Sequence, residues 1–542
     1  MGLIPIRLLH EPLLRHARTT PRHPVLISHG LTHSYRELAG NAARLARYLM
    51  RHGLQRGDRV AIYTGNTYEC AASIYGTLCA GGVFVVVHAQ TKAEKLARII
   101  DDCGARVLVF DVGLREHAAS AVARCPSLLT VLVAGGDGGA DPDPGSAGDG
   151  GRSETPFAEA VVTGPDETPL PFVNPLDLAA LIYTSGSTGE PKGVMMTHQL
   201  MLFAAESISE YLEMAETDRI VNVLPLSFDY GLYQLLMTVR LGATLVLEDT
   251  FAYPSRLIHA VKAHEATVFP GVPTIFTMLV SIYRTSGLEL PSVRIITNTA
   301  AALSDDLVPD IRRIFPHATV YKTYGLTECK RVSYLPPEYF GRKPGSVGRA
   351  IPGTEVFLRS PEGALVAPGE IGILHVRGPH VMLGYWNKRE ATRRMLRDGK
   401  YRYERVLCTG DWFRMDADGF LYFYGRTDDI IKSRGEKISP VEVENTIRRL
   451  QAVEDVAVVG VPHEVLGEAV AALVVLRPDE VCTTQDVRSH CSRYLEGYMV
   501  PTSVVFLDSL PKTPSGKVKK ANLVQSQEKQ PWNRQWLRRR RR

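Results

Sequence analysis

The chain has 542 residues, more than one hydrophobic core normally organises, so two or more domains are expected. Its composition, 45% hydrophobic and 22% charged residues, is that of an ordinary globular protein. The net charge is +5, and the last five residues, Arg538–Arg542, are all arginine. The rest of the chain is therefore nearly neutral, which argues against a nucleic-acid-binding protein.

The eight cysteines lie far apart, with no C-x-x-C pair and no histidine cluster at metal-ligand spacing. This spacing indicates neither a disulfide framework nor a zinc site. The start of the chain lacks the basic and apolar regions of a signal peptide, and no apolar run reaches about eighteen residues. We therefore expect a cytoplasmic enzyme with no transmembrane segment. Its oligomeric state is not indicated.

The first 130 residues alternate helical and strand-like patterns. A helix is predicted over Arg36–His52, which carries Leu38, Leu45 and Leu49 at helical spacing. Strands are predicted at residues 59–63, 83–87 and 106–110. This α/β alternation predicts a mostly parallel sheet covered by helices. Residues 134–151 contain no hydrophobic side chain larger than alanine, which predicts a flexible insert.

A glycine-rich segment follows the predicted buried strand Leu178–Tyr183. Its anion-binding candidates are Thr184, Ser185, Gly186, Ser187, Thr188, Gly189 and Lys192. The glycines allow backbone N–H groups to approach an anion, and the hydroxyls and the lysine add donors. A Walker loop is disfavoured, because Glu190-Pro191 separates the last of these glycines from the lysine. A flexible surface turn is the alternative, but the lysine and the preceding strand favour phosphate binding.

Further strands are predicted at residues 220–224, 243–247, 266–269 and 293–296. Each ends near Pro, Gly, Asp or Asn, where open α/β sheets bind ligands. Strands follow one another with little helix between residues 357 and 424, which predicts a smaller β-rich lobe. After Asp428 short α/β units return.

Five segments carry a family resemblance in the same order along most of the chain. They are Tyr183-Thr-Ser-Gly-Ser-Thr-Gly-Glu-Pro-Lys-Gly193, Tyr324-Gly-Leu-Thr-Glu328, Gly410-Asp411, Gly425-Arg-Thr-Asp-Asp-Ile-Ile-Lys432 and Pro511-Lys-Thr-Pro-Ser-Gly-Lys517. This series resembles the AMP-forming acyl-adenylating superfamily, which includes acyl-CoA synthetases, luciferases and the adenylation domains of nonribosomal peptide synthetases. One short motif would be weak support, but an ordered set is not.

The resemblance implies a two-domain organisation. A large N-terminal domain, residues 1–427, would bind ATP and the acid on mostly parallel sheets with a β-rich lobe. A small mobile C-terminal α/β domain, residues 428–527, would carry the catalytic lysine. Residues 528–542 would form a basic disordered tail, with binding to acidic lipid or to an acidic carrier protein as the alternative.

The same resemblance assigns roles in adenylate formation with ATP and Mg²⁺. Lys517 would bridge the substrate carboxylate and the α-phosphate, Thr327 would donate to an α-phosphate oxygen, and Glu328 would hold the metal. Further nucleotide contacts are implied at Ala300, Tyr324, Asp411, Arg426 and Lys432. Taken alone, Asp411 could cap a helix and Tyr324 could pack in the core, but the shared order favours the site.

The implied second step joins the acyl group to a thiol, as in acyl-CoA synthetases. In that step the C-terminal domain would rotate at Asp428, and Gly435 would lie where the pantetheine thiol of CoA approaches. The acid pocket is expected to include Asp229, Tyr230, Gly271, Ala301 and Lys330. A non-catalytic binding module on the same fold would be expected to lack Lys517 or Glu328, and both are present.

Asp229 leaves two substrates open. In amino-acid adenylation domains a similarly placed aspartate holds the substrate ammonium, so the enzyme could load an amino acid onto the phosphopantetheine of a peptidyl carrier protein. Alternatively, Asp229 is structural and paired with Lys330 or Arg331, and an ordinary acid is joined to CoA. We prefer the interpretation in which an ordinary acid is joined to CoA, because no other segment of an amino-acid pocket is recognisable.

Overall fold

The structure is a computed structural model in which residues 6–135, 154–162, 168–185, 191–249, 251, 253–299, 303, 307–427, 429–433, 436–463, 466–495, 497–512, 518, 520 and 523 are described. At residues 162, 185, 432, 436, 437 and 467 only the backbone is described. The predicted flexible insert falls almost entirely outside these residues, and so does the basic tail.

One seven-stranded sheet has the order β7-β6-β5-β3-β4-β8-β9. All neighbouring pairs are parallel except β8 and β9, which form an antiparallel hairpin. Its strands are β3 (Arg59–Thr64), β4 (Val83–His88), β5 (Val107–Asp111), β6 (Thr130–Ala134), β7 (Glu154–Pro156), β8 (Leu178–Ser185) and β9 (Pro191–Thr197). The predicted parallel sheet is thereby confirmed.

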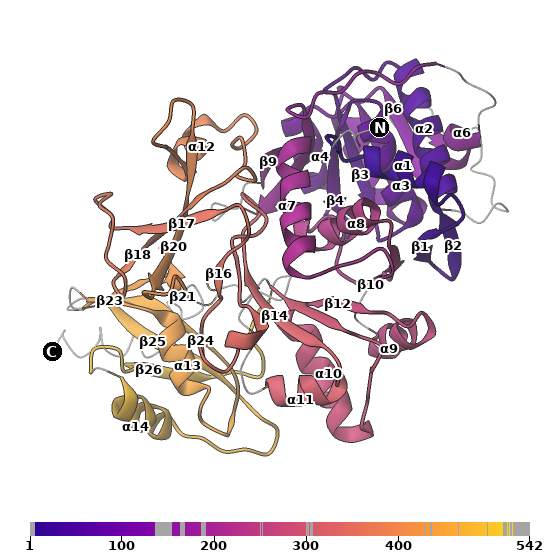
Figure 1. The fold of residues 1–542 in the computed structure, drawn as a ribbon. Helices are drawn as coiled ribbons and strands as arrows, with labels where there is room; N and C mark the ends of the chain where they lie inside the picture. Colours follow the sequence, from indigo (N-terminus) through magenta and orange to yellow (C-terminus); the bar gives the residue numbers. More distant parts are fainter. Residues whose placement is uncertain are drawn as a thin grey trace.

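Helices of the first 162 residues gather around this sheet, at the indigo end of the chain in Figure 1. The predicted helix at 36–52 is confirmed as α2, which begins with a capping box between Ser34 and Glu37. Its apolar face, including Leu38 and Leu45, is fully buried. The helices are α1 (Glu11–Thr19), α2 (Tyr35–Arg51), α3 (Tyr68–Cys79), α4 (Ala93–Cys103), α5 (Arg115–Arg124) and α6 (Phe157–Val162), with a 3₁₀ turn at Val112–Leu114.

A second sheet of nine strands has the order β16-β15-β14-β13-β12-β10-β11-β1-β2. Strands β14, β13, β12, β10, β11 and β1 are parallel, as their apolar runs predicted. The strands are β1 (Pro24–Ser28), β2 (Leu31–Ser34), β10 (Arg219–Asn222), β11 (Thr244–Leu247), β12 (Val268–Gly271), β13 (Ile295–Asn298), β14 (Thr319–Tyr324), β15 (Ser333–Tyr334) and β16 (Arg349–Ala350).

Five helices accompany this sheet, and α7 and α8 lie between it and the first sheet (Figure 1). They are α7 (His198–Tyr211), α8 (Asp229–Leu241), α9 (Pro254–Ala263), α10 (Pro273–Ser286) and α11 (Val308–Ile314), and a 3₁₀ turn follows at Pro337–Tyr339. Asn222, Gly271, Asn298 and Tyr324 end four parallel strands, so polar or small residues collect at one edge of the sheet.

Two smaller sheets complete the fold. The β-rich lobe is antiparallel and comprises β17 (Glu355–Arg359), β18 (Ile371–Arg377), β19 (Leu396–Asp398), β20 (Arg405–Met415) and β21 (Leu421–Arg426), with α12 (Arg389–Met395). The last sheet comprises β22 (Ile431–Ser433), β23 (Glu436–Ile438), β24 (Val453–His463), β25 (Gly467–Leu476) and β26 (Ser503–Phe506), with α13 (Pro440–Ile447) and α14 (Thr484–Tyr494). In Figure 1 this yellow region lies beside β20 and β21, and α13 contacts β21.

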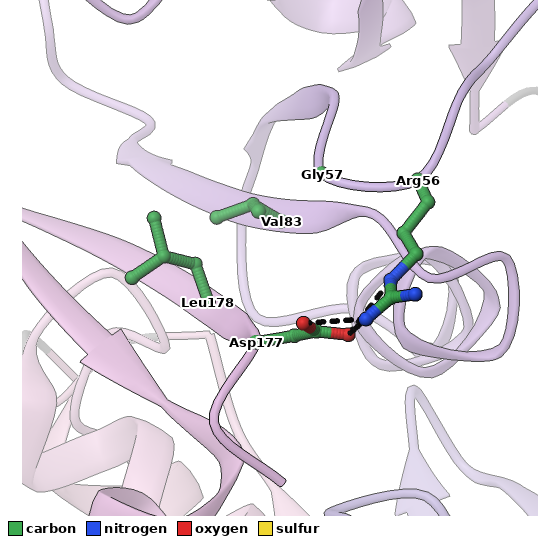
Figure 2. Close-up of a pocket in the computed structure, with 5 residues that line it drawn as sticks. All are labelled: Arg56, Gly57, Val83, Asp177 and Leu178. Carbon is green, nitrogen blue, oxygen red and sulfur yellow. Dashed lines mark hydrogen bonds and ion pairs between the residues drawn. The ribbon is translucent and has the colours of Figure 1, made fainter. Parts of the chain in front are cut away.

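A shallow pocket lies at the amino-terminal ends of the strands of the first sheet (Figure 2). It is lined by Arg56, Gly57, Val83, Asp177 and Leu178. Arg56 donates to both carboxylate oxygens of Asp177, at 2.9 and 2.7 Å. Arg56 is half-exposed, so this pair adds little stability. Ligands of open parallel sheets bind at the opposite, carboxyl edge, which leaves this pocket outside the candidate site.

Among the described residues, no helix is long and apolar enough to cross a membrane.

Two buried histidines are expected to lower the free energy of unfolding in acid. Burial lowers the pKa of His10 to about 4 and that of His198 to about 3. His198 Nδ1 accepts a hydrogen bond from the Leu9 N–H at 3.2 Å. Protonation of Nδ1 would remove this acceptor and place two N–H donors against each other. Because the unfolded chain binds these protons below a pH of about 6.5, the free energy of unfolding should fall as the pH drops from there towards 4.

Denaturant midpoints measured across this pH range test the expectation. The His10→Leu variant should show a shallower pH dependence than the parent, by an amount on the order of 3 kcal/mol at the acid end. His259→Leu, at an exposed position, is the control and should keep the parent slope. Parallel slopes for the parent and His10→Leu would contradict the assignment.

Candidate functional site

A tight turn after β14 carries two of the predicted site residues, Thr327 and Glu328. A Cβ on Gly325 would collide with the backbone carbonyl of Lys330, so the turn can close only with glycine at that position. The Cys329 N–H donates to the Leu326 carbonyl at 3.0 Å, and Lys330 adopts a left-handed conformation with φ of 62°. The turn is therefore fixed by its own backbone.

Three of the predicted nucleotide contacts meet beside this turn. The Tyr324 hydroxyl donates to Asp411 Oδ2 at 2.5 Å, and Arg426 Nε donates to Asp411 Oδ1 at 3.2 Å. Burial and then the Asp411 carboxylate raise the pKa of the Tyr324 phenol well above its usual range, so it remains a donor. The Asp411 side chain is 9% exposed and that of Arg426 is 61% exposed. A buried carboxylate is thus held between a phenol and a guanidinium.

The pairing of β20 with β21 creates this contact. Asp411 and Arg426 lie directly opposite each other across the two strands, so the position predicted as a possible helix cap is in a strand. Immediately beyond Arg426, both the N–H and the hydroxyl of Thr427 donate to the Gly410 carbonyl, at 2.8 and 2.5 Å.

Glu328 and Lys192 are joined through a residue that the sequence analysis missed, Tyr385. The Tyr385 hydroxyl donates to Glu328 Oε1 at 2.6 Å, and Lys192 Nζ lies 5.5 Å from the centre of the Tyr385 ring. Burial and then Glu328 raise the pKa of Tyr385, which keeps its hydroxyl protonated. No described residue donates to the second Glu328 oxygen, Oε2.

Backbone pairing with β9 explains the position of Tyr385. Residues 383–386 run along β9. The Met195 N–H donates to the Gly384 carbonyl and the Leu383 N–H donates to the Met195 carbonyl, and an antiparallel bridge joins Val194 to Tyr385. No sequence signal near Tyr385 indicated this role. The contact with Glu328 spans 57 positions and depends on the folded chain.

The β8–β9 hairpin brackets the predicted phosphate loop. Thr184 pairs with Lys192 and Ser185 with Pro191 at the end of the hairpin. The predicted buried strand before the loop is confirmed as β8. Gly186, Ser187, Thr188 and Gly189 lie outside the described residues, as does the side chain of Ser185.

Four of the predicted acid-pocket residues, Asp229, Tyr230, Gly271 and Lys330, lie in the described part of the chain at or near Tyr230. Asp229 and Tyr230 begin α8, and the Tyr230 hydroxyl donates to the Thr297 carbonyl at 2.9 Å. Gly271 ends β12, the strand next to β13, which carries Thr297. Lys330 Nζ lies 5.1 Å from the Tyr230 ring centre. No ion pair within 4.0 Å joins Asp229 to Lys330 or Arg331, although Asp229 acts to raise the pKa of Lys330.

Several predicted residues cannot be placed by their side chains. Lys432 lies in β22, with only its backbone described. The positions outside the described residues are Ala300, Ala301, Asp428, Gly435 and Lys517. Lys512 and Val518, on either side of Lys517, form an antiparallel bridge.

Comparison with known proteins identifies the family. The model for AMP-binding enzymes matches residues 13–386, and that for the AMP-binding enzyme C-terminal domain matches residues 442–517. The chain belongs to the AMP-binding enzyme family. It is therefore an AMP-forming ligase that joins an acid to a thiol, as the resemblance implied.

Two CoA-dependent relatives and one solved structure match this AMP-binding enzyme along nearly their full lengths. A long-chain-fatty-acid–CoA ligase of Bacillus subtilis is 30% identical, covering 97% of this chain and 95% of the relative. A feruloyl-CoA synthase of Amycolatopsis is 33% identical, covering 94% and 97% respectively. ATP-bound MatB of Rhodopseudomonas palustris is 28% identical, covers 96% of this chain and 99% of that chain, and superposes with a TM-score of 0.82.

The residues of this AMP-binding enzyme also suit a magnesium nucleotide. Mg²⁺ prefers oxygen ligands and often takes only one or two carboxylates together with phosphate oxygens. Glu328 offers such a carboxylate, with Oε1 oriented by Tyr385. Among the described residues no cluster of three or more His, Cys, Asp or Glu could hold a metal without such phosphates.

Proposed function

We propose that this AMP-binding enzyme condenses ATP with a carboxylic acid at the site formed by Lys192, Glu328, Asp411 and Arg426, and then transfers the acyl group to CoA. The first product would be an acyl-adenylate with release of pyrophosphate. The second would be an acyl-CoA thioester. Relatives described as CoA ligases support CoA as the thiol.

The observation that carries this proposal is the convergence of two hydrogen-bonded groups on one turn. Tyr324, at the start of the turn, donates to the Asp411–Arg426 pair. Glu328, further along the turn, accepts from Tyr385, whose ring faces Lys192. Arg426 also lowers the pKa of Tyr385 against the effect of burial, so the two groups share one electrostatic environment.

Each group suits one part of the reaction. Asp411 and Arg426 can bind the ribose hydroxyls, with the carboxylate accepting and the guanidinium donating. Lys192 and the loop donors suit the pyrophosphate, while Thr327 suits an α-phosphate oxygen. Bound Mg²⁺ would neutralise phosphate charge beside Glu328. Lys517 would bring the substrate carboxylate against the α-phosphate, reducing the repulsion between the two anions.

Thioester formation requires a second arrangement in this proposal. Residues 428–527 would turn about Asp428, withdraw Lys517 and bring Gly435 towards the adenylate. The Asp428→Pro variant tests this step, because proline fixes the φ angle at the turning point. ATP–pyrophosphate exchange should be retained while CoA thioester formation slows. An equal loss of both half-reactions would exclude Asp428 as the hinge.

A second candidate function is supported by Asp229. Its side chain is buried, the residue being 7% exposed, yet it forms no ion pair within 4.0 Å in the described part of the chain. A substrate ammonium could supply the missing partner, and the enzyme would then load an amino acid onto a carrier-protein phosphopantetheine.

ATP–pyrophosphate exchange with fatty, aromatic and amino acids distinguishes the two functions. The CoA ligase should use acids without an amino group and should keep most of its exchange in Asp229→Ala. If amino acids alone support exchange, and Asp229→Ala loses it, the carrier-loading function replaces the preferred one. Thioester formation with CoA and with a phosphopantetheine carrier protein then identifies the acceptor.

A further inference from the structure

Three buried charged side chains surround Tyr230. Asp229 is 7%, Lys330 4% and Arg331 2% exposed. Asp229 comes from the first turn of α8, whereas the two cations come from the turn after β14 that also carries Glu328. Burying three charges in one place is costly unless each has a partner.

Aromatic rings are the main neighbours of the two cations. Lys330 Nζ lies 5.1 Å from the centre of the Tyr230 ring and 4.8 Å from that of Tyr233. The Arg331 guanidinium lies 5.6 Å from the Tyr230 ring. Such contacts offset only part of the free-energy cost of removing a cation from water. The rings orient the cations without neutralising them.

Carboxylate partners are missing within the described part of the chain. Neither Lys330 nor Arg331 has a carboxylate oxygen within 4.0 Å there. Arg331 Nη1 donates to the Thr323 hydroxyl, while its buried Nε has no hydrogen-bond partner. The cluster therefore has two cationic groups and one carboxylate at longer range.

The cluster adjoins the proposed adenylation site. Lys330 and Arg331 follow Glu328 by two and three residues. Two hydrogen bonds hold both ends of this stretch to the same neighbouring segment. The Met382 N–H donates to the Glu328 carbonyl at 2.8 Å, and the His380 ring donates from Nε2 to the Arg331 carbonyl at 2.9 Å. An acid whose reacting carboxylate lay near Glu328 could therefore extend its far end towards the cations.

We propose that the acid pocket selects a carboxylic acid with a second anionic group, such as a second carboxylate, which Arg331 and Lys330 bind at the far end of the substrate. This inference rests on the proposed adenylation function. It gives the unpaired Arg331 Nε an acceptor and the buried cations a counter-charge. A plain monocarboxylic acid would leave both cations unpaired at its far end.

Matched pairs of acids test the proposal. Alkanoates and α,ω-dicarboxylates of equal carbon number, together with benzoate and its carboxylated analogue isophthalate, are compared by ATP–pyrophosphate exchange. The diacid of the best pair should have a kcat/KM at least about tenfold higher, corresponding to one well-formed charge-assisted contact. Arg331→Met should lower kcat/KM for the diacid by at least about tenfold more than for the monoacid, so that most of the preference is lost.

Arg349→Met is the matched control. Arg349 also faces two aromatic rings, those of Tyr339 and Phe420, but it is exposed and comes from β16. Its replacement should leave the diacid preference intact. If Arg331→Met fails to fold, Lys330→Met is used, and if both fail, the preference of the unmodified protein decides.

Two outcomes overturn different statements. Equal use of monoacids and diacids, or an equal loss of both in Arg331→Met, overturns the second-anion inference and assigns the cations to the reacting carboxylate or to packing. If ATP binds by calorimetry but no acid of any class supports exchange, the adenylation function itself fails.

Discussion

Replacing Glu328 with glutamine should lower ATP–pyrophosphate exchange by about 10²- to 10³-fold, the usual cost of removing one preorganised electrostatic contact to a transition state. Glutamine keeps the length of the side chain and can still accept from Tyr385, so the turn is expected to remain folded. What is lost is the negative charge proposed to hold Mg²⁺. A rise in the Mg²⁺ concentration needed for half-maximal exchange should accompany the loss.

Glu338→Gln is the control for this experiment, because Glu338 is exposed and lies outside the turn. Exchange within about threefold of the parent in Glu328→Gln, less than 1 kcal/mol of barrier, would remove Glu328 from the site. Magnesium and nucleotide binding measured by calorimetry provide a readout that does not depend on turnover.

Replacing Asp411 with asparagine should raise the KM for ATP by about 10- to 150-fold. A hydrogen bond to a charged group contributes about 1.5–3 kcal/mol, and each 1.4 kcal/mol changes affinity tenfold. The variant removes the charge that Arg426 contacts but keeps an oxygen for the Tyr324 hydroxyl. The rate at saturating ATP should change much less than the KM, because the ribose lies away from the reacting phosphate.

Asp418→Asn serves as the control, since Asp418 is largely exposed and follows β20 in the same hairpin. Its KM for ATP should match that of the parent. If Asp411→Asn loses activity equally at low and saturating ATP, and also unfolds at a lower temperature, its role is structural rather than in binding the nucleotide.

Local patterns were sufficient to predict much of the fold. The apolar runs at 83–87 and 106–110 became β4 and β5 in a parallel sheet, because continuous apolar strands are stable only when both faces are covered. The run at 220–224 ended earlier than predicted: β10 stops at Asn222, whose side chain bonds both the N–H and the carbonyl of Leu224.

Contacts between distant segments were beyond such reasoning. The sequence suggested a carboxylate partner for Lys330 and Arg331, but the left-handed turn at Lys330 directs the cations towards Tyr230 and Tyr233. Similarly, nothing around Tyr385 predicted its bond to Glu328, because this bond depends on how residues 383–386 pair with β9. The adenylation residues themselves were proposed from resemblance, and their catalytic roles stay predictions.

The two bonds from Thr427 to the Gly410 carbonyl have a mechanical consequence. Gly410 precedes Asp411, and Thr427 follows Arg426, so the carboxylate–guanidinium pair and the last residue before the proposed hinge belong to one paired segment of β20 and β21. No loop lies between them to absorb movement. The proposed hinge would therefore follow directly on a hydrogen-bonded strand pair that also carries the proposed ribose contacts, so nucleotide binding and domain rotation would be read at adjoining positions of the backbone.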